Sequence, residues 1–300
     1  MKTRTLIIGA TAALLMGSSA QAATSIVFVG NSFTLGAGSA LKNYHMSEVH
    51  DLNLPDARGQ TIGGMASVFK EFTKEAGLDY DVSVEAVGGK NFDFHYNEKG
   101  KLLDRAWDHV VMQSYSQLNK DDPGNPAIVV EYARKFDTMF HAKNPNVKYW
   151  FNATWSRADY KNKEIAPWVG KPVDQMGKDV YAGFEKAKAA TPRVAGIIPV
   201  GLAWNRAFAT GVADSTPADG IEAGKLDLWT WDSQHGSNPG YILATLVIFG
   251  QITGRDPLSL GDRENVSMDM GLTPAIMHSL EQVAHDELAA HGVSMQMAMK

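Results

Sequence analysis

Residues 26–35 read Ile-Val-Phe-Val-Gly-Asn-Ser-Phe-Thr-Leu, and this stretch decides the expected fold. Its first four residues are apolar and mostly β-branched or aromatic, which predicts a short buried strand. The strand ends at Gly30, and Ser32 follows two positions later. Ligands of open α/β sheets bind beyond the carboxyl ends of the strands, so a hydroxyl at this place is a candidate nucleophile. The alternative is an ordinary turn, because Gly, Asn and Ser are common turn residues.

The composition is that of a globular protein with one substantial core or two small ones. The 300 residues are 44% hydrophobic and 20% charged, and the formal net charge is −5. The sequence contains no basic cluster or stripe, which argues against a nucleic-acid partner. It also contains no cysteine, so disulfides, thiolate catalysis and cysteine metal sites are excluded.

The N-terminal segment, residues 1–22, has the pattern of a secretory signal peptide. A basic start precedes an apolar run over residues 6–16, and residues 20–22 match the Ala-x-Ala cleavage pattern. The apolar run is too short to span a bilayer, although a retained N-terminal anchor is the alternative. We therefore expect an exported protein, periplasmic or secreted, whose mature chain 23–300 has no stable membrane anchor.

Apolar segments with strand and helix periodicity alternate after the first strand. Further strands are expected at residues 81–87, 110–112, 148–153 and 194–200, and helices at 65–76, 126–140, 174–190, 241–252 and 274–291. Such alternation is typical of βαβ units, and hence of a parallel sheet with helices on both faces. We predict one α/β domain over 23–300, a three-layer α/β/α fold with a flavodoxin-like five-stranded parallel sheet. Residues 36–63 lack a period and are expected to form a long loop beside Ser32, with a short helix around 40–49.

A second informative stretch precedes the most apolar helix. Residues 227–240 read Asp-Leu-Trp-Thr-Trp-Asp-Ser-Gln-His-Gly-Ser-Asn-Pro-Gly, which places Asp232 three positions before His235. On one short turn, the carboxylate can accept a hydrogen bond from the imidazole, fix its tautomer and leave the other nitrogen facing outward. The alternative for this pair alone is a capping aspartate beside a solvated loop histidine.

Together these blocks resemble the GDSL-like (SGNH) esterase and lipase superfamily, in the branch with Gly-Asn-Ser-Phe-Thr at the nucleophile. The matching blocks are residues 30–34 after the first strand, Gly88-Gly89 after the second, and Asp-x-x-His before the last core helix. The resemblance spans residues 25–256. It implies a three-layer α/β/α domain with a Ser-His-Asp hydrolytic site.

The resemblance also implies a role for each residue of that site. Ser32 would be the nucleophile, His235 the general base, and Asp232 the residue that orients the imidazole. The oxyanion hole would contain the backbone N–H groups of Ser32 and Gly89, with Gly88 as the alternative to Gly89.

One block of the family pattern is missing. The family has Gly-x-Asn-Asp after its third strand, where this chain has Gln113-Ser114-Tyr115-Ser116. The third oxyanion donor is then either the amide of Gln113 or the hydroxyl of Tyr115. Because one donor is lost, a catalytically weak, ligand-binding relative on the same fold stays open as an alternative.

Aromatic residues near the sheet edge suggest the substrate. Trp155, Trp231 and Tyr115 are the candidate substrate-binding residues, because they belong to segments that converge on the edge where Ser32 lies. The alternative is that such tryptophans are buried anchors. Exposed rings would suit sugars, so we expect a small-molecule or polysaccharide ester substrate with a short, most simply acetyl, acyl group. A lipase for longer acyl chains is the alternative.

No cofactor or metal is expected. His45 and His50 flank Glu48, but this spacing does not match a metal-binding helix, and a polar loop explains it better. Nothing in the sequence indicates an oligomeric state.

Overall fold

The computed structural model describes residues 22–53, 61–159 and 167–297. The expected signal peptide lies outside these residues except for its last position, so its assignment stays a prediction. None of the helices in the described residues combines the length and the apolar character needed to cross a membrane.

Six parallel strands form one sheet in the order β2-β3-β1-β4-β5-β6. The five expected strands are β1 (Thr24–Gly30), β3 (Tyr80–Ala86), β4 (His109–Met112), β5 (Lys148–Asn152) and β6 (Gly196–Ile198). The additional strand, β2 (His50–Asp51), pairs with β3 at the sheet edge and is too short to show a period in the sequence. Without β2 the order is that of flavodoxin-like sheets, which confirms the predicted α/β class.

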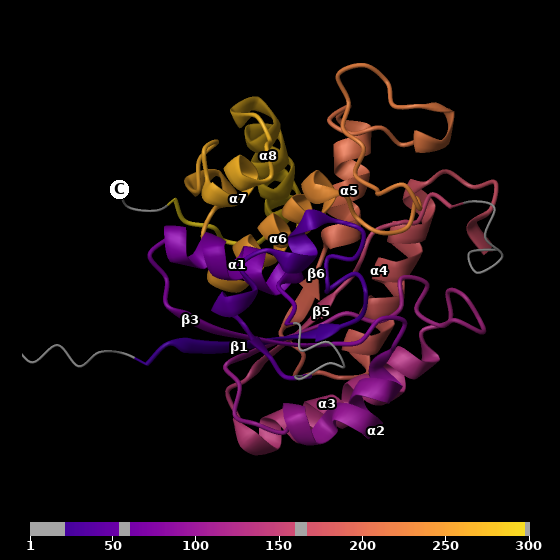
Figure 1. The fold of residues 1–300 in the computed structure, drawn as a ribbon. Helices are drawn as coiled ribbons and strands as arrows, with labels where there is room; N and C mark the ends of the chain where they lie inside the picture. Colours follow the sequence, from indigo (N-terminus) through magenta and orange to yellow (C-terminus); the bar gives the residue numbers. More distant parts are fainter. Residues whose placement is uncertain (1–21, 54–60, 160–166, 298–300) are drawn as a thin grey trace, which may run out of the picture.

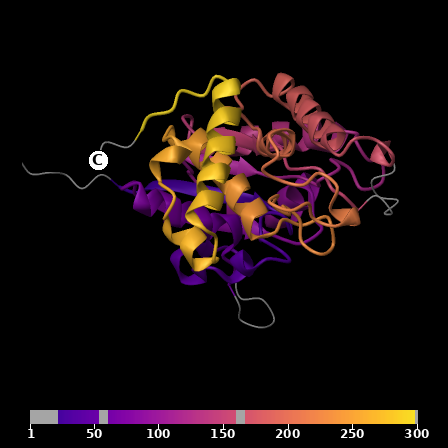
Figure 2. The ribbon, with the colours of Figure 1, turned by 90° about the horizontal axis from the view of Figure 1, so that it is seen from above.

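Helices cover both faces of the sheet (Figure 1). On one face lie α1 (Gly64–Glu75), α5 (Val200–Ala209), α6 (Asn238–Thr253) and α8 (Pro274–Ala290), with the short α7 (Asn265–Asp269) at its periphery. On the other face lie α2 (Phe92–Leu103), α3 (Ala127–Lys143) and α4 (Asp174–Ala189). In the view from above, α8 (yellow) runs across the other helices of its own face (Figure 2). The three layers are those the sequence predicts.

The β1 strand divides the core into two clusters. Ile26 and Phe28 pack into the cluster with α1, α5, α6 and α8, whereas Val27 and Val29 pack into the cluster on the opposite face. Successive side chains of a strand point to opposite faces, so a strand buried on both must be apolar throughout. This explains the unbroken apolar run that precedes the candidate nucleophile.

The α6 helix holds the second informative stretch in place. The Ser237 hydroxyl caps its N-terminus by accepting a hydrogen bond from the Gly240 N–H, and Gly254 ends it in the left-handed conformation. Most of the helix is buried. The turn with Asp232 and His235 therefore ends on a rigid element.

The predicted loop over 36–63 has local structure where it is described. It contains two short 3₁₀ helices, η1 (Ala40–Asn43) and η2 (Met46–Glu48), in place of the single helix expected around 40–49, and then β2. Residues 54–60 lie outside the described part of the chain.

Candidate active site

Ser32 lies in a tight turn that begins where β1 ends. A Cβ atom at Gly30 would lie 2.1 Å from Thr34 Oγ1 and 2.7 Å from Gln113 Oε1, so no other residue fits there without rearrangement. The Leu35 N–H donates to the Asn31 carbonyl at 3.0 Å and closes the turn around the serine. The first strand thus delivers the hydroxyl to the carboxyl edge of the sheet, as its sequence predicts.

Asn31 and Gln113 hold this turn in place through hydrogen bonds to neighbouring loops. Asn31 is buried, and its amide donates to the carbonyls of Lys90 at 3.0 Å and Ser114 at 3.2 Å, in the loops after β3 and β4. Gln113 Oε1 accepts hydrogen bonds from the Asn31 N–H and the Thr34 hydroxyl, both at 3.0 Å. Three loops that are distant in sequence are therefore joined at the nucleophile.

The placement of Gln113 corrects the expectation that it supplies an oxyanion donor. Its side chain is 1% exposed, and its amide N–H donates to the carbonyl of Ser114. The strand β4 ends at Met112, so the next side chain points down into the sheet edge instead of into the site. Gln113 therefore holds the turn that carries Ser32 in place.

The structure brings Ser32, His235 and Asp232 together. His235 Nε2 lies 2.8 Å from Ser32 Oγ, and His235 Nδ1 lies 2.6 Å from Asp232 Oδ2. The two hydrogen bonds use opposite sides of one imidazole, which is the relay geometry of serine hydrolases. Ser32 and His235 are 203 residues apart in the sequence and meet only because of the fold.

Asp232 is held as a carboxylate. Its Oδ1 accepts hydrogen bonds from the Thr230 hydroxyl at 2.8 Å and from the N–H groups of Gln234 and His235 at 2.9 Å. Burial raises the pKa of Asp232, but the hydrogen bonds from His235, Gln234 and Thr230 outweigh it and lower that pKa to about 2. An ionised Asp232 requires a proton on His235 Nδ1, so His235 Nε2 is the acceptor for the Ser32 hydroxyl.

Two backbone N–H groups are available beside Ser32 for an oxyanion. Among the described residues, neither the Ser32 N–H nor the Gly89 N–H has a hydrogen-bond acceptor. Gly89 adopts the left-handed conformation at φ +67°, which favours glycine, and the Tyr115 hydroxyl donates to its carbonyl. Tyr115 therefore fixes the glycine that faces the nucleophile.

A cavity of about 150 Å³ opens over Ser32 and Gly89. Its further lining includes Tyr115, Arg157 and Lys120. Arg157 is 2% exposed and forms an ion pair with Asp159 at 2.5 Å. The sequence did not identify Arg157 or Lys120 as site residues, because they lie in loops without a motif.

Of the two tryptophans predicted to bind the substrate, only one is exposed to solvent. Trp155 is fully buried and stacks on Trp204 at 4.5 Å, and its indole N–H donates to the Gln234 carbonyl at 3.1 Å. It therefore supports the turn of Asp232 and His235 from inside the core, which corrects its assignment as a substrate-binding residue. Trp231 is 91% exposed, beside Asp232, as a platform residue would be.

Comparisons with known proteins agree with the fold. The chain is similar to a DUF4886 family protein from Bacteroides uniformis, with a TM-score of 0.58 and 14% identity over 91% of this chain and 97% of that one. It is also similar to a candidate GDSL-like lipase from Parabacteroides merdae, with a TM-score of 0.50 and 13% identity over 77% of this chain and 95% of that one. No protein-family model and no curated protein matches the chain. At these identities the likeness shows a shared fold.

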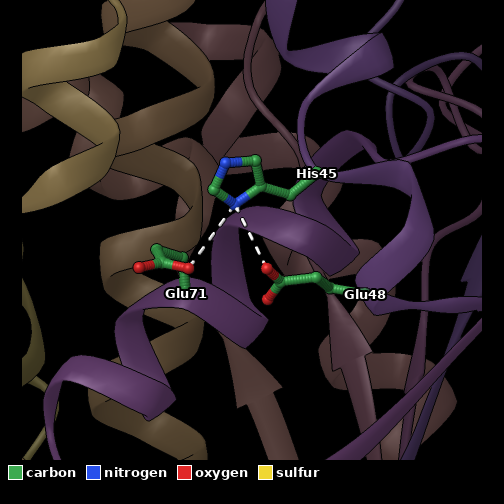
Figure 3. Close-up of side chains that lie close together, drawn as sticks. All are labelled: His45, Glu48 and Glu71. Atoms are coloured by element: carbon green, nitrogen blue, oxygen red, sulfur yellow. Dashed lines mark ion pairs between the residues drawn. The ribbon is translucent and has the colours of Figure 1, made fainter.

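A separate cluster, formed by α1, η2 and the residue before η2, holds three side chains of metal-ligating type. The ligand atoms of His45, Glu48 and Glu71 lie within 4.8 Å of one another, and His45 Nδ1 faces both carboxylates (Figure 3). Lys74 Nζ lies 3.3 Å from the carboxylates of both glutamates. This ammonium already supplies a positive charge, so the cluster is an ion-pair network. His50, which the sequence placed near this group, pairs instead with Asp81 at 3.0 Å.

Proposed function

We propose that this protein is a serine esterase. The observation that carries the proposal is the continuous hydrogen-bonded chain from Ser32 Oγ through His235 to Asp232. A serine hydroxyl is a weak nucleophile by itself and needs an adjacent base that can take its proton. The fold likeness to a candidate GDSL-like lipase is consistent with this assignment.

The first half of the reaction forms an acyl-enzyme. Ser32 Oγ attacks the ester carbonyl carbon while its proton moves to His235 Nε2, and Asp232 stabilises the resulting imidazolium. The N–H groups of Ser32 and Gly89 donate to the negative oxygen of the tetrahedral intermediate. When the intermediate collapses, the C–O bond of the ester breaks and His235 gives its proton to the leaving alcohol.

The second half releases the acid. Water gives a proton to His235 Nε2 and attacks the acyl carbon, so a second tetrahedral intermediate forms in the same oxyanion hole. Its collapse breaks the bond to Ser32 Oγ, which recovers its proton from the imidazole. Ester and water are thereby converted to acid and alcohol, and the enzyme is regenerated.

The cavity favours a short acyl group. Its volume of about 150 Å³ and its polar lining, which includes Gln117 and Arg157, provide no apolar channel for a long acyl chain. The exposed Trp231 offers a flat ring beside the catalytic turn, of the kind that packs against sugars. The substrate we propose is therefore an acetyl ester, carried by a carbohydrate. The N-terminal pattern further supports an exported enzyme, periplasmic or secreted.

The test is hydrolysis of p-nitrophenyl acetate by the purified protein and by Ser32→Ala and His235→Ala. Each variant should lose at least about a thousandfold in kcat with an unchanged melting temperature, because the two residues act as a unit. A chelator should leave the rate unchanged. Near wild-type turnover by Ser32→Ala would exclude the serine mechanism.

A further inference from the structure

A second cavity, of about 370 Å³, adjoins the cavity over Ser32. The two share Gly89, Tyr115 and Lys120 in their linings. The second cavity runs between α2 and the segment 115–121. We call it the α2 groove. A molecule bound with its ester carbonyl at Ser32 can therefore extend past Tyr115 into this groove.

Four charged side chains that line the α2 groove have no partner among the described residues. The side chains of Asp93, Glu98, Lys120 and Asp121 make no hydrogen bond or ion pair with any described residue. Asn97 also lines the groove and uses only its amide nitrogen, which donates to the Tyr132 hydroxyl at 3.3 Å. Several hydrogen-bond acceptors and at least one free donor therefore face the same space.

The balance of charge in the groove selects against a simple ion. Three carboxylates, those of Asp93, Glu98 and Asp121, stand with two ammonium groups, those of Lys90 and Lys120. Lys90 is further held over the Phe94 ring at 4.8 Å. A neutral ligand that both donates and accepts many hydrogen bonds fits this lining better than an anion or a cation.

The same lining excludes a long aliphatic acyl chain. A fatty chain in the groove would cover ionised carboxylates without replacing their contacts with water, which costs free energy. Hydroxyl groups would replace those contacts, and the rings of Phe94 and Tyr115 offer flat apolar surfaces beside them. This combination of flat rings and dense hydrogen-bonding groups matches a sugar ring.

We propose that the α2 groove is a carbohydrate subsite that binds sugar units next to the esterified one. The proposal rests on the esterase function proposed above and adds a binding subsite for the part of the glycan that carries no reacting ester. Trp231 belongs to the turn of His235, whereas the groove adjoins Gly89 on the oxyanion side. Sugar contacts at both places would suit an ester on an internal unit of a glycan, whose chain continues in both directions.

The experiment compares one small ester with one glycan ester. The substrates are p-nitrophenyl acetate and acetylated xylo-oligosaccharides of defined length, and the groove variant is the double substitution Asp93→Ala with Glu98→Ala. This double substitution should lower kcat/KM for the oligosaccharides by about ten- to a hundredfold. It should lower kcat/KM for p-nitrophenyl acetate far less, because only the glycan reaches the groove. Lys101→Ala, on α2 but outside the groove, is the matched control and should change neither rate.

A binding measurement separates this proposal from the esterase function. Deacetylated xylo-oligosaccharides are titrated into the unsubstituted protein and the groove variant by calorimetry, which requires no catalysis. Weaker binding by the variant supports the subsite even if no ester is hydrolysed. The proposal is overturned if the variant binds as the unsubstituted protein does, if both substrates are affected equally, or if the groove variant selectively changes hydrolysis of p-nitrophenyl octanoate.

Discussion

Two carboxylate–histidine pairs of nearly identical geometry lie at the carboxyl edge of the sheet. In one, Asp232 Oδ2 lies 2.6 Å from His235 Nδ1, and in the other, Glu85 Oε2 lies 2.6 Å from His95 Nδ1. The first pair is partly exposed, at 17% for His235 and 23% for Asp232, whereas both side chains of the second are 0% exposed. A short contact between these groups therefore does not by itself make a catalytic site.

The pairs differ in what their remaining atoms meet. His235 Nε2 reaches Ser32 Oγ, and Asp232 Oδ1 accepts three hydrogen bonds. His95 Nε2 and Glu85 Oε1 are buried without a hydrogen-bond partner among the described residues. In the proposed mechanism the first pair passes a proton between serine and substrate, whereas the second pair has no such group beside it among the described residues.

The second pair nevertheless has a place in the site. Glu85 lies near the end of β3 and His95 in the first turns of α2, so their contact closes the loop that carries Gly89. We infer a structural role, in which the pair fixes the distance between strand and helix. The comparison therefore separates the proton transfer that we propose for Asp232 and His235 from a structural role of Glu85 and His95.

Between the carboxylates of the two pairs, the larger catalytic effect is expected from Asp232→Asn. The Asp232 carboxylate accepts a hydrogen bond from His235 Nδ1, whereas an amide NH2 in its place would donate one to that nitrogen. The imidazole then takes the wrong tautomer, and kcat should fall by about a thousand- to ten-thousandfold. The melting temperature should fall modestly, because the lowered pKa of Asp232 means that its carboxylate stabilises the fold. The fall should be smaller than for the fully buried pair, because this pair is partly exposed. Activity assays and thermal unfolding of the same preparation check both statements. An active Asp232→Asn protein would remove the distinction between the two pairs.

The opposite pattern is expected from Glu85→Ala. Removal of one partner leaves His95 buried and alone, which should lower the free energy of unfolding by about 3–5 kcal/mol, as measured by urea denaturation. Asp81→Ala, at an exposed position of the same strand, is the control and should cost about 1 kcal/mol or less. A loss of kcat at full stability would contradict the structural role and make the buried pair part of the catalytic machinery.

The sequence predicted the local pair and missed the distant one. Asp232 and His235 are three residues apart and follow a recognisable pattern, whereas Glu85 and His95 come from a strand and a helix that meet only in the fold. The helix itself, α2, was not predicted, because few of its residues are buried and they form no clear stripe. The α2 groove, which this helix lines, could therefore not be predicted from the sequence either.

The positions beyond each strand were easier to predict than the directions of their side chains. The apolar runs of the sequence predicted five of the six strands. The ends of those strands placed Ser32 and Gly89 together, and both residues line one cavity in the structure. Gln113 and Trp155 also follow strands, but their side chains point into the protein. A residue's place at a strand end is set locally, whereas its exposure depends on which neighbouring loops cover it.

A smaller catalytic effect is expected from Gln113→Ala. Its Oε1 atom holds the Asn31 N–H and the Thr34 hydroxyl, so its loss should loosen the turn of Ser32 and lower kcat about tenfold with little change in KM. Thr34→Val, which removes one of the two contacts, should have a weaker effect in the same assay. An effect as large as that of Ser32→Ala would instead indicate a direct catalytic role for Gln113.

The last prediction concerns Glu281 on α8, a buried carboxylate. No histidine of the described residues lies as close to it as His95 lies to Glu85. Glu281 is 1% exposed, its Oε1 has no hydrogen-bond partner among the described residues, and His278 Nδ1 lies 4.0 Å away. Burial, aided by the charge of Glu264, raises the pKa of Glu281 to about 8. The folded state therefore binds a proton that the unfolded state releases near pH 4.5, and stability is lost as the pH rises from about 4.5 to 8.

Glu281→Gln should remove this loss. At pH 8.5 the free energy of unfolding of this variant should exceed that of the unsubstituted protein by about 1–3 kcal/mol. At pH 4.5 the two should differ little, and urea denaturation at both pH values measures the difference. Glu287 on the same helix is the matched control, because hydrogen bonds from His291 and Arg206 outweigh its burial and lower its pKa. Glu287→Gln should therefore lose stability above about pH 5, where the ionised carboxylate is favoured in the folded state. If both substitutions shift stability in the same direction with pH, then partners do not decide the behaviour of buried carboxylates here, and the contrast between the pairs at Asp232 and Glu85 fails as well.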